Sequence, residues 1–413
     1  MTPDHQTDRV TGLRTLPKGV WVLGFVSLLT DISSEMVHSL LPLFLVGVLG
    51  SSATLVGVLE GLAEGTALVV RVFSGTLSDR WGRRKAPAVL GYGLGALAKP
   101  VFALATSASL VFGARIMDRI GKGIRGAPRD ALVADLTPPP QRGAAFGLRQ
   151  SLDTVGALLG PGVAVLLMWL WHDDIRLVFR VAVIPAVLAV LLLILGVRET
   201  AAPVAKQTAT PARRWRSLPD LPPAYWWVVG IGALFMLARF SEAFLVLRAE
   251  QSGLPVRYVP LAMVVMNILY AASAYPFGAL SDRWSHRRLL ALGLAILLIA
   301  DMALAVAARS VFMVALGLAL WGLHLGITQG LLSVMIARSA PAHLRGTAFG
   351  VFGLVSGVAV LLASIVAGVL WDRFGPATTF LAGAAVAVLT LVVLWRAPIA
   401  VFAQVGSAAG NSN

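Results

Sequence analysis

The stretch at positions 75–85, GTLSDRWGRRK, is repeated at positions 278–288 as GALSDRWSHRR. A second motif, RGAAFG at 142–147, is repeated at 345–350 as RGTAFG. Both repeats are offset by 203 residues, since 75 becomes 278 and 142 becomes 345. Two separate motifs at one common offset are hard to obtain by chance. The sequence therefore predicts two homologous halves, each built from the same series of elements.

The composition places these halves in a membrane. Of the 413 residues, 57% are hydrophobic and only 13% are charged, whereas a soluble protein usually carries about 25% charged residues. Apolar runs of roughly 20 residues recur along the chain, and each is long enough to cross a bilayer. Because the backbone must satisfy its own hydrogen bonds inside lipid, we expect helices. We expect no cleavable signal peptide, because the chain is polar through Lys18 and the first apolar run is long.

The basic residues concentrate in alternate loops between the apolar runs. The net charge of +14 could suggest nucleic-acid binding, but this distribution is the positive-inside asymmetry of membrane proteins. It predicts a multi-pass protein of a cell membrane, such as a bacterial inner membrane, with both termini in the cytoplasm, and it argues against a nucleic-acid partner. The absence of cysteine excludes disulfides, cysteine-ligated metals and thiol catalysis.

We expect an all-α membrane protein with twelve spans in two pseudo-symmetric six-helix halves. The N-terminal half is predicted at 19–197 and the C-terminal half at 223–396. A cytoplasmic linker at 198–222 joins them, between an N-terminal segment at 1–18 and a tail at 397–413. The individual spans are predicted at 19–49, 54–77, 86–106, 108–128, 143–170, 176–197, 223–247, 257–281, 289–308, 311–337, 346–370 and 376–396. Membrane repeats of this kind favour a transporter with its site between the halves.

The repeated stretch resembles the loop between the second and third helices of the major facilitator superfamily. The resemblance rests on Gly75, Leu77, Asp79, Arg80, Gly82, Arg83 and Arg84, and on Gly278, Leu280, Asp282, Arg283 and Arg287 in the second copy. The second copy departs from the motif with Ser285 and His286. A carboxylate flanked by arginines at a helix boundary can make charge-assisted bonds that differ between two states. We expect a gating role for Asp79 and Arg80, and a mainly topological one for Arg83 and Lys85. The predicted gating loop comprises Gly75, Asp79, Arg80, Gly82, Arg83, Asp282 and Arg283.

Two further motifs resemble the same superfamily. Gly156, Gly160 and Pro161 are similar to its antiporter motif, although Ala164 and Val165 replace two further glycines. This resemblance implies export by antiport. The run from Asp118 to Leu132 is similar to a poorly characterised prokaryotic branch, with Lys122 in place of the usual glutamine of the fourth-helix motif. The runs 31–36 and 240–248 support the same branch, to which we attach no substrate.

Ionisable residues inside predicted spans are functional hypotheses, because their burial is costly. Asp31, Glu35 and His38 share one helical face, since they lie at i, i+4 and i+7. In a twelve-helix transporter, the first, fourth, seventh and tenth spans normally line the cavity. The set expected to couple protons or contact substrate is Asp31, Glu35, His38, Glu64, Arg119, Asp153, Arg239, Glu242 and His324. The alternative for Arg149 with Asp153 and for Arg239 with Glu242 is a static ion pair.

These observations favour a secondary active transporter that exports a small solute by alternating access, driven by protons. The alternatives left open are proton-coupled uptake of a metabolite, export of a divalent metal ion by the carboxylates with His38 and His324, and coupling to sodium. Trp321 could stack on a ligand or pack in the core. No phosphate-binding loop or enzyme motif is found in the sequence. We therefore expect no enzyme activity, no cofactor and no bound metal, and a monomer in the bilayer.

Overall fold

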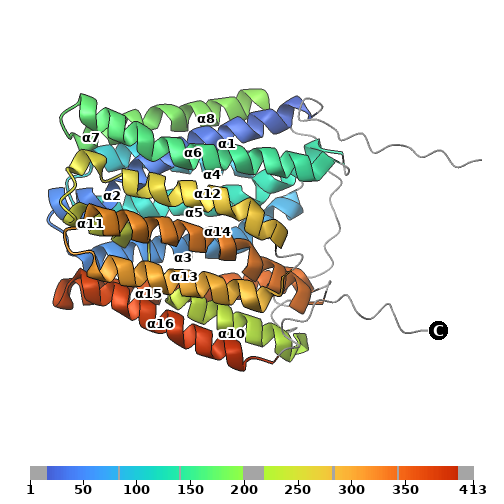
Figure 1. Cartoon of the computed structure of the whole chain (residues 1–413). Helices are drawn as coiled ribbons and strands as arrows, with labels where there is room; N and C mark the ends of the chain where they lie inside the picture. The colour runs from blue at the N-terminus through green and yellow to red at the C-terminus, as the bar shows by residue number, and fades with distance from the viewer. Residues whose placement is uncertain are drawn as a thin grey trace, which may run out of the picture.

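The computed structural model describes residues 16–81, 84–138, 141–198, 218–280, 284–341 and 344–398, and these parts are helical. The helices run side by side through the molecule (Figure 1). The predicted N-terminal segment up to Thr15, most of the linker and the tail after Pro398 lie outside the described residues. The first residues of α1 and α10 and the last residues of α8 and α16 all lie at one end of the bundle (Figure 1). We call this the near end, and the opposite end, which holds Gly50, Asp173, Gly253 and Gly375, the far end.

The N-terminal half contains six helical passes between these ends. They are formed by α1 (Lys18–His38) with α2 (Leu41–Leu43) and the π-helix η2 (Phe44–Val48), α3 (Ala53–Trp81), α4 (Lys85–Leu104), α5 (Ala108–Leu136), α6 (Arg142–Leu170), and α7 (Ile175–Val181) with α8 (Val183–Gly196). The first predicted span is thus interrupted after His38, where Pro42 opens the next short helix. Proline has no backbone N–H to continue the preceding helix.

The C-terminal half repeats this arrangement. Its elements are η4 (Leu218–Asp220), α10 (Pro223–Leu237), α11 (Ala243–Gln251), η5 (Val256–Tyr258), α12 (Leu261–Leu280), α13 (His286–Val306), α14 (Val311–Ser339), α15 (Arg345–Phe374) and α16 (Pro376–Arg396). The span predicted at 223–247 is broken between Ala238 and Glu242. The Ser241 hydroxyl accepts a hydrogen bond from Ala243 N, and Ser241 N donates to Ser364 Oγ. These side-chain bonds replace helical ones at the break.

Ten of the described helical segments are long and apolar enough to cross a membrane. The other two predicted spans are α5, which is 29 residues long but rich in charge, and the pair α10 and α11, of which α10 has 15 residues. α5 also continues through Pro128 to Leu136, so the end predicted for the fourth span was too early. Pro128 lies inside this helix, and neighbouring helices can satisfy the backbone groups that a proline leaves free in a membrane helix.

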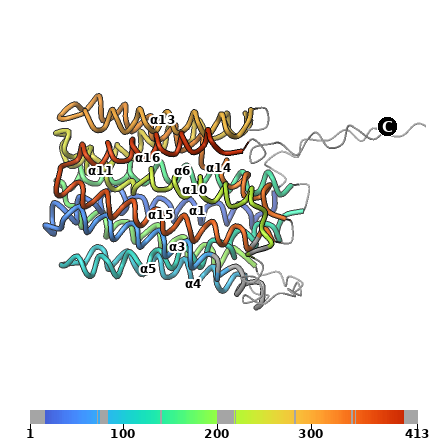
Figure 2. The backbone as a smooth tube through the Cα atoms, turned by 90° about the horizontal axis from the view of Figure 1, so that it is seen from below, coloured from blue at the N-terminus to red at the C-terminus, as the bar shows by residue number. Residues whose placement is uncertain are grey.

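The two halves meet where α3 packs along α15 and where α6 packs on α12. The α3 and α15 helices lie side by side in both views (Figure 2). Small residues bring them close: a Cβ at Gly57 would collide with the backbone of Ser364, and one at Gly61 would lie 2.8 Å from Leu361 Cα. Between α6 and α12, Asn267 Nδ2 donates to Ala157 O at 3.2 Å. Close approach of backbones is what small residues permit in membrane helices.

Two polar contacts join the halves at the far end. The Asp372 carboxylate, near the end of α15, accepts hydrogen bonds from Ala53 N and Thr54 N at 3.0 and 2.8 Å, and from Thr54 Oγ1 at 2.6 Å. Arg257 Nη2 lies 2.9 Å from Asp173 Oδ2. Each contact joins a residue of the C-terminal half to a residue of the N-terminal half, so the two contacts hold the halves together at the far end.

Candidate functional site

The charged stripe of α5 is buried in the N-terminal half. Arg115, Asp118, Arg119 and Arg125 are all less than 7% exposed, because α5 packs between α3 and α4. Asp118, Arg119 and Arg125 lie three, four and ten residues after Arg115, so the four side chains share one face of the helix. The sequence alone predicts that such a charged face does not meet lipid, because exposure of these side chains to lipid is costly. The burial of the four side chains agrees with this prediction.

Each of three buried cations has a carboxylate partner. Arg115 Nη2 lies 2.6 Å from Glu60 Oε2, and both side chains are 2% exposed. Arg119 Nη1 lies 2.8 Å from Glu64 Oε1. Lys99 of α4 forms the third pair, with Asp118 of α5. Buried charges are tolerated only when they are paired and hydrogen-bonded in this way, so the pairs tie α3 to α5.

Lys99 connects three helices. Its Nζ lies 2.9 Å from Asp118 Oδ1 of α5 and donates to Ser34 Oγ of α1 at 3.2 Å. Asp118 Oδ2 also lies 3.9 Å from Arg119 Nε. Lys99 was absent from the predicted site, although a lone lysine in an apolar span is the kind of residue that the same rule singles out. Lys99 lies on the third span, whereas the first, fourth, seventh and tenth spans were expected to line the cavity.

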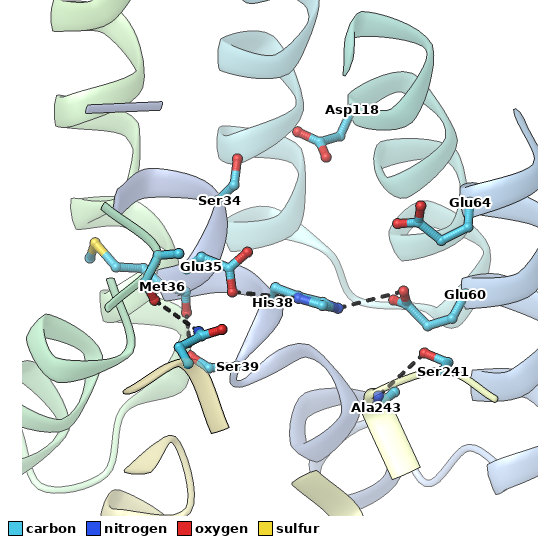
Figure 3. A network of polar contacts seen from close by, with 12 residues as sticks. Ser34, Glu35, Met36, His38, Ser39, Glu60, Glu64, Asp118, Ser241 and Ala243 are labelled. Atoms are coloured by element: carbon cyan, nitrogen blue, oxygen red, sulfur yellow. Dashed lines mark hydrogen bonds and ion pairs between the residues drawn. The ribbon is translucent and has the colours of Figure 1, made fainter. Parts of the chain in front are cut away.

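His38 lies between two carboxylates from different helices (Figure 3). Its Nδ1 is 3.6 Å from Glu35 Oε2 on α1, and its Nε2 is 3.7 Å from Glu60 Oε2 on α3. Because Glu60 also binds Arg115, the contacts form a chain from Glu35 to α5. Of the three residues predicted to share a face of α1, the structure brings Glu35 and His38 together.

A second cluster of charges lies nearer the near end. Arg149 Nη1 of α6 is 3.5 Å from Asp153 Oδ2, and its Nε is 3.9 Å from Asp130 Oδ1 of α5. Arg129 approaches the same two carboxylates, at 3.1 Å from Asp130 and 4.0 Å from Asp153. Arg71 of α3 lies 3.7 Å from Asp130. The pairing of Arg149 with Asp153 is therefore real but shared, because three arginines and two aspartates form a network among α3, α5 and α6.

The glycines of the predicted antiporter motif face α1. A Cβ at Gly156 would lie 2.7 Å from Leu28 O and 2.9 Å from Asp31 Cβ, and a Cβ at Gly160 would lie 2.6 Å from Glu35 Cβ. Pro161 is buried beside them in α6. The two glycines thus let α6 press against the turns of α1 that carry Asp31 and Glu35. Asp31 makes no ion pair within 4.0 Å with any described cation.

The C-terminal candidates lie at the break of the seventh span and behind it. Arg239 and Glu242 flank the break, and no ion pair within 4.0 Å joins them; the Arg239 guanidinium lies 6.0 Å from the centre of the Phe235 ring. His324 is 0% exposed, with Nδ1 at 2.8 Å from Gly293 O and its ring stacked on Phe235. Trp321 is buried, and its ring lies 5.4 Å from the ring of Phe240, so in this structure it packs in the core.

Comparison with known proteins identifies the family to which this chain belongs. The model of the Major Facilitator Superfamily matches residues 23–363 and 240–409, which together span most of the chain. The chain belongs to the major facilitator superfamily. It is therefore a multi-pass secondary transporter and not an enzyme.

Individual relatives share either the sequence or the fold. An uncharacterised MFS-type transporter of Methanocaldococcus jannaschii is 31% identical over 92% of this chain and 95% of the relative. The multidrug resistance protein MdtH of Photorhabdus laumondii is 34% identical, but over only 39% of each chain. Among solved structures, a nucleoside transporter, NupG, has a TM-score of 0.73 over 93% of this chain and 99% of its own, at 14% identity. A POT family transporter in complex with a thioalcohol-conjugated peptide has a TM-score of 0.77 over 93% of this chain and 98% of its own, at 14% identity. These two structures support the fold.

Most of the gating loop of this transporter lies beyond what the structure describes. Gly82, Arg83, Asp282 and Arg283 are outside the described residues, and Gly75, Asp79 and Arg80 are assigned to the last turns of α3 without a described side chain. Arg84, the next residue of the motif, has its Nε 3.1 Å from Asp135 Oδ2 of α5. A contact between this motif and the fourth span therefore exists at the near end.

The described part of the transporter contains no group of three or more His, Asp or Glu side chains arranged to hold a metal ion. His38 and His324 belong to different halves, and His324 is packed inside the C-terminal half. The observed geometry brings together paired cations and carboxylates, which can exchange partners or protons.

Proposed function

We propose that this transporter exports a small solute in exchange for protons. The observation that carries the proposal is the position of His38 between Glu35 and Glu60, which links α1, α3 and α5 through buried charges. A proton taken up by Glu35 or Glu60 removes one negative charge from this series of contacts. The cation beside that carboxylate, His38 or Arg115, then loses part of its charge compensation, and another arrangement of the three helices becomes favourable.

Alternating access supplies the second arrangement. The polar contacts of Asp372 and Arg257 join the two halves at the far end. The near end is where the positive-inside pattern places the cytoplasm. We therefore assign this structure to a state closed toward the outside. Transport would require the far-end contacts to break while the halves close at the near end, around a site near the middle of the membrane.

The second charge cluster extends the proposed proton route. Arg129 and Arg149 each contact both Asp130 and Asp153. If one aspartate takes up a proton, each arginine therefore still has the other aspartate as a charged partner. Asp31 lies beside Gly156 on the neighbouring turn of α1. The route would thus use Asp31 and Asp153 toward the near end, and Glu35, Glu64 and His38 toward the far end. Arg119 would hold Glu64 through their ion pair, while Arg239 and Glu242 would contact substrate at the seventh-span break.

Export rather than uptake is supported by the packing of Gly156 and Gly160 against α1, as the resemblance to the antiporter motif implies. The partial likeness to a multidrug resistance protein agrees with it. We propose a cationic or amphipathic organic solute, a bacterial inner membrane, two six-helix halves at 19–197 and 223–396, and a monomer. Both termini would be cytoplasmic.

The test uses purified protein in liposomes that contain a pH-sensitive dye. A pH gradient is imposed, and cationic drugs, divalent metals and anionic metabolites are added one at a time. Substrate-dependent proton movement that disappears in Glu35→Gln and persists in Glu250→Gln, an exposed carboxylate on α11, supports the proposal. The direction of the proton movement relative to the solute separates antiport from uptake. Solute flux without proton movement in the unmodified transporter would overturn proton coupling.

A further inference from the structure

Asp301 is a carboxylate that the proposed proton route does not use. It lies on α13, is 0% exposed, and neither of its carboxylate oxygens has a hydrogen-bond partner among the described residues. It also makes no ion pair within 4.0 Å with any described cation. Glu60 and Asp118, two carboxylates of the N-terminal half that are less than 5% exposed, each have a cationic partner, so Asp301 differs from them in kind.

The Asp301 carboxyl group lies directly behind the break of the seventh span. A Cβ at Gly383 of α16 would lie 2.7 Å from Asp301 Oδ2, 3.0 Å from Phe240 Cε1 and 3.5 Å from Ala238 O. This point on α16 therefore lies close to α13 and to two residues of the non-helical segment between α10 and α11. Ala238 O belongs to the first residue after α10, and no described donor hydrogen-bonds it. Only glycine at position 383 leaves room for this arrangement.

The charged and titratable groups around Asp301 are all engaged elsewhere. On α14, His324 bonds Gly293 O, and in the break Arg239 lies over Phe235. On α11, Arg248 donates to Leu304 O at 2.9 Å and to Ala305 O at 3.4 Å. Glu242 lies at the other side of the break, and α16 carries no ionisable residue before Arg396. None of these groups compensates a negative charge on Asp301 through a direct contact.

An ionised carboxylate in this position would be both desolvated and unpaired, which is the least favourable state for a buried charge. A proton needs no additional ligands and removes the charge. It also converts the carboxyl group into a hydrogen-bond donor, and Ala238 O, a carbonyl without a described donor, lies near the same point of α16. We propose that Asp301 is a second proton-binding site, located in the C-terminal half, and that its occupancy is tied to the conformation of the seventh-span break.

The far end is the side from which this proton would exchange. Asp301 is five residues from the end of α13 at Val306, a distance of about 7–8 Å at 1.5 Å per residue. Arg248 fastens α11 to the last turn of α13 between Asp301 and that end. The contacts of Asp372 and Arg257 close the same end. Opening the far end would move α11 and bring water to Asp301, so the bound proton would leave or enter in that state.

This inference adds to the proposed proton coupling, but its test needs no substrate. Infrared difference spectra are recorded on the full-length transporter in lipid bilayers during a pH titration. Protons are one probe and sodium chloride at constant pH is the other. We expect a carbonyl band of a protonated carboxylic acid that persists at a pH where exposed carboxyl groups are ionised. The band should be lost completely in Asp301→Asn and unchanged in Glu250→Gln.

A second variant keeps the test decisive if the asparagine variant does not fold. Gly383→Ala leaves Asp301 in place and forces a Cβ against it, so it should shift the frequency of the same band. An unchanged band in both Asp301→Asn and Gly383→Ala would overturn the proposal. A band that sodium abolishes at constant pH would overturn it in favour of a sodium site. Loss of substrate-driven proton movement in Glu35→Gln, measured separately, tests the proposed function and not this site.

Discussion

Asp372 of the C-terminal half caps the first turn of a helix in the N-terminal half by accepting hydrogen bonds from Thr54 N and Thr54 Oγ1. A carboxylate at a helix N-terminus is favoured by the helix dipole and by unsatisfied N–H groups. Since this cap belongs to the other half of the molecule, it forms only while the far end is closed.

Asp372→Asn should therefore open the far end more often. Hydrogen bonds to a charged group contribute about 1.5–3 kcal/mol, so a loss at the lower limit raises the open population about tenfold. The chain has no cysteine, so Leu245→Cys on α11, buried in this state, can report opening through an impermeant maleimide. Labelling should be about tenfold faster in Asp372→Asn. Asp220→Asn, an exposed carboxylate in η4, is the control, and equal rates in both would contradict the prediction.

The ion pair between Glu60 and Arg115 should show strong coupling in stability. Removing one partner of a buried pair costs about 3–5 kcal/mol, because the other charge is left uncompensated. Glu60→Leu and Arg115→Leu should each lower the thermal unfolding temperature in detergent far more than the double variant does. If the two single effects simply add in the double variant, the pair does not stabilise the helix bundle in the way its 2.6 Å contact implies.

Gly160 and Gly162 offer a matched comparison on α6. A Cβ at Gly160 would lie 2.6 Å from Glu35 Cβ, whereas nothing lies within 4 Å of a Cβ at Gly162. Gly160→Ala should push α6 away from α1 and reduce transport strongly, while Gly162→Ala should retain it. Solute flux in liposomes at equal protein content is the measurement. Similar flux from the two variants would show that close packing at Gly160 is dispensable.

A similar pair of glycines tests the interface between the halves. A Cβ at Gly57 would collide with the backbone of Ser364, but one at Gly65 would meet only Gly357 O at 3.8 Å. Gly57→Ala should destabilise the state closed at the far end and raise the labelling of Leu245→Cys. Gly65→Ala should leave labelling unchanged. Faster labelling in Gly65→Ala alone would be the opposite of what the packing predicts.

The features that sequence reasoning captured depend on repetition and on charge. The common offset of two motifs predicted two halves, and the charges of α5 predicted a buried face, because neither depends on knowing the neighbours. The break at Ala238–Glu242 was not predicted, since this segment contains no glycine or proline. Its cause is tertiary: Ser364 of α15 accepts the bond from Ser241 N.

Partners across helices were equally hard to foresee. Sequence spacing placed Glu35 and His38 on one face, but the role of Glu60 as the second partner of His38 depends on how α1 crosses α3. His324 met the rule for an ionisable residue in a lining helix, yet it bonds Gly293 and stacks on Phe235 in this state. Whether it contacts substrate stays a prediction. Roles of Asp79 and Arg80 also stay predictions, because their side chains are not described.

The charge of α5 has a consequence for how this protein is made. Each charged residue at the centre of an isolated membrane helix costs about 2.5–3.5 kcal/mol on insertion scales, and α5 carries Arg115, Asp118, Arg119 and Lys122 within two turns. A helix with this many charges inserts poorly into a membrane when no partner helix is present. Glu60, Glu64 and Lys99, on the two helices synthesised just before it, supply partners for Arg115, Arg119 and Asp118. Since α3 and α4 precede α5 in the chain, we expect both helices to remain near the insertion machinery until α5 joins them.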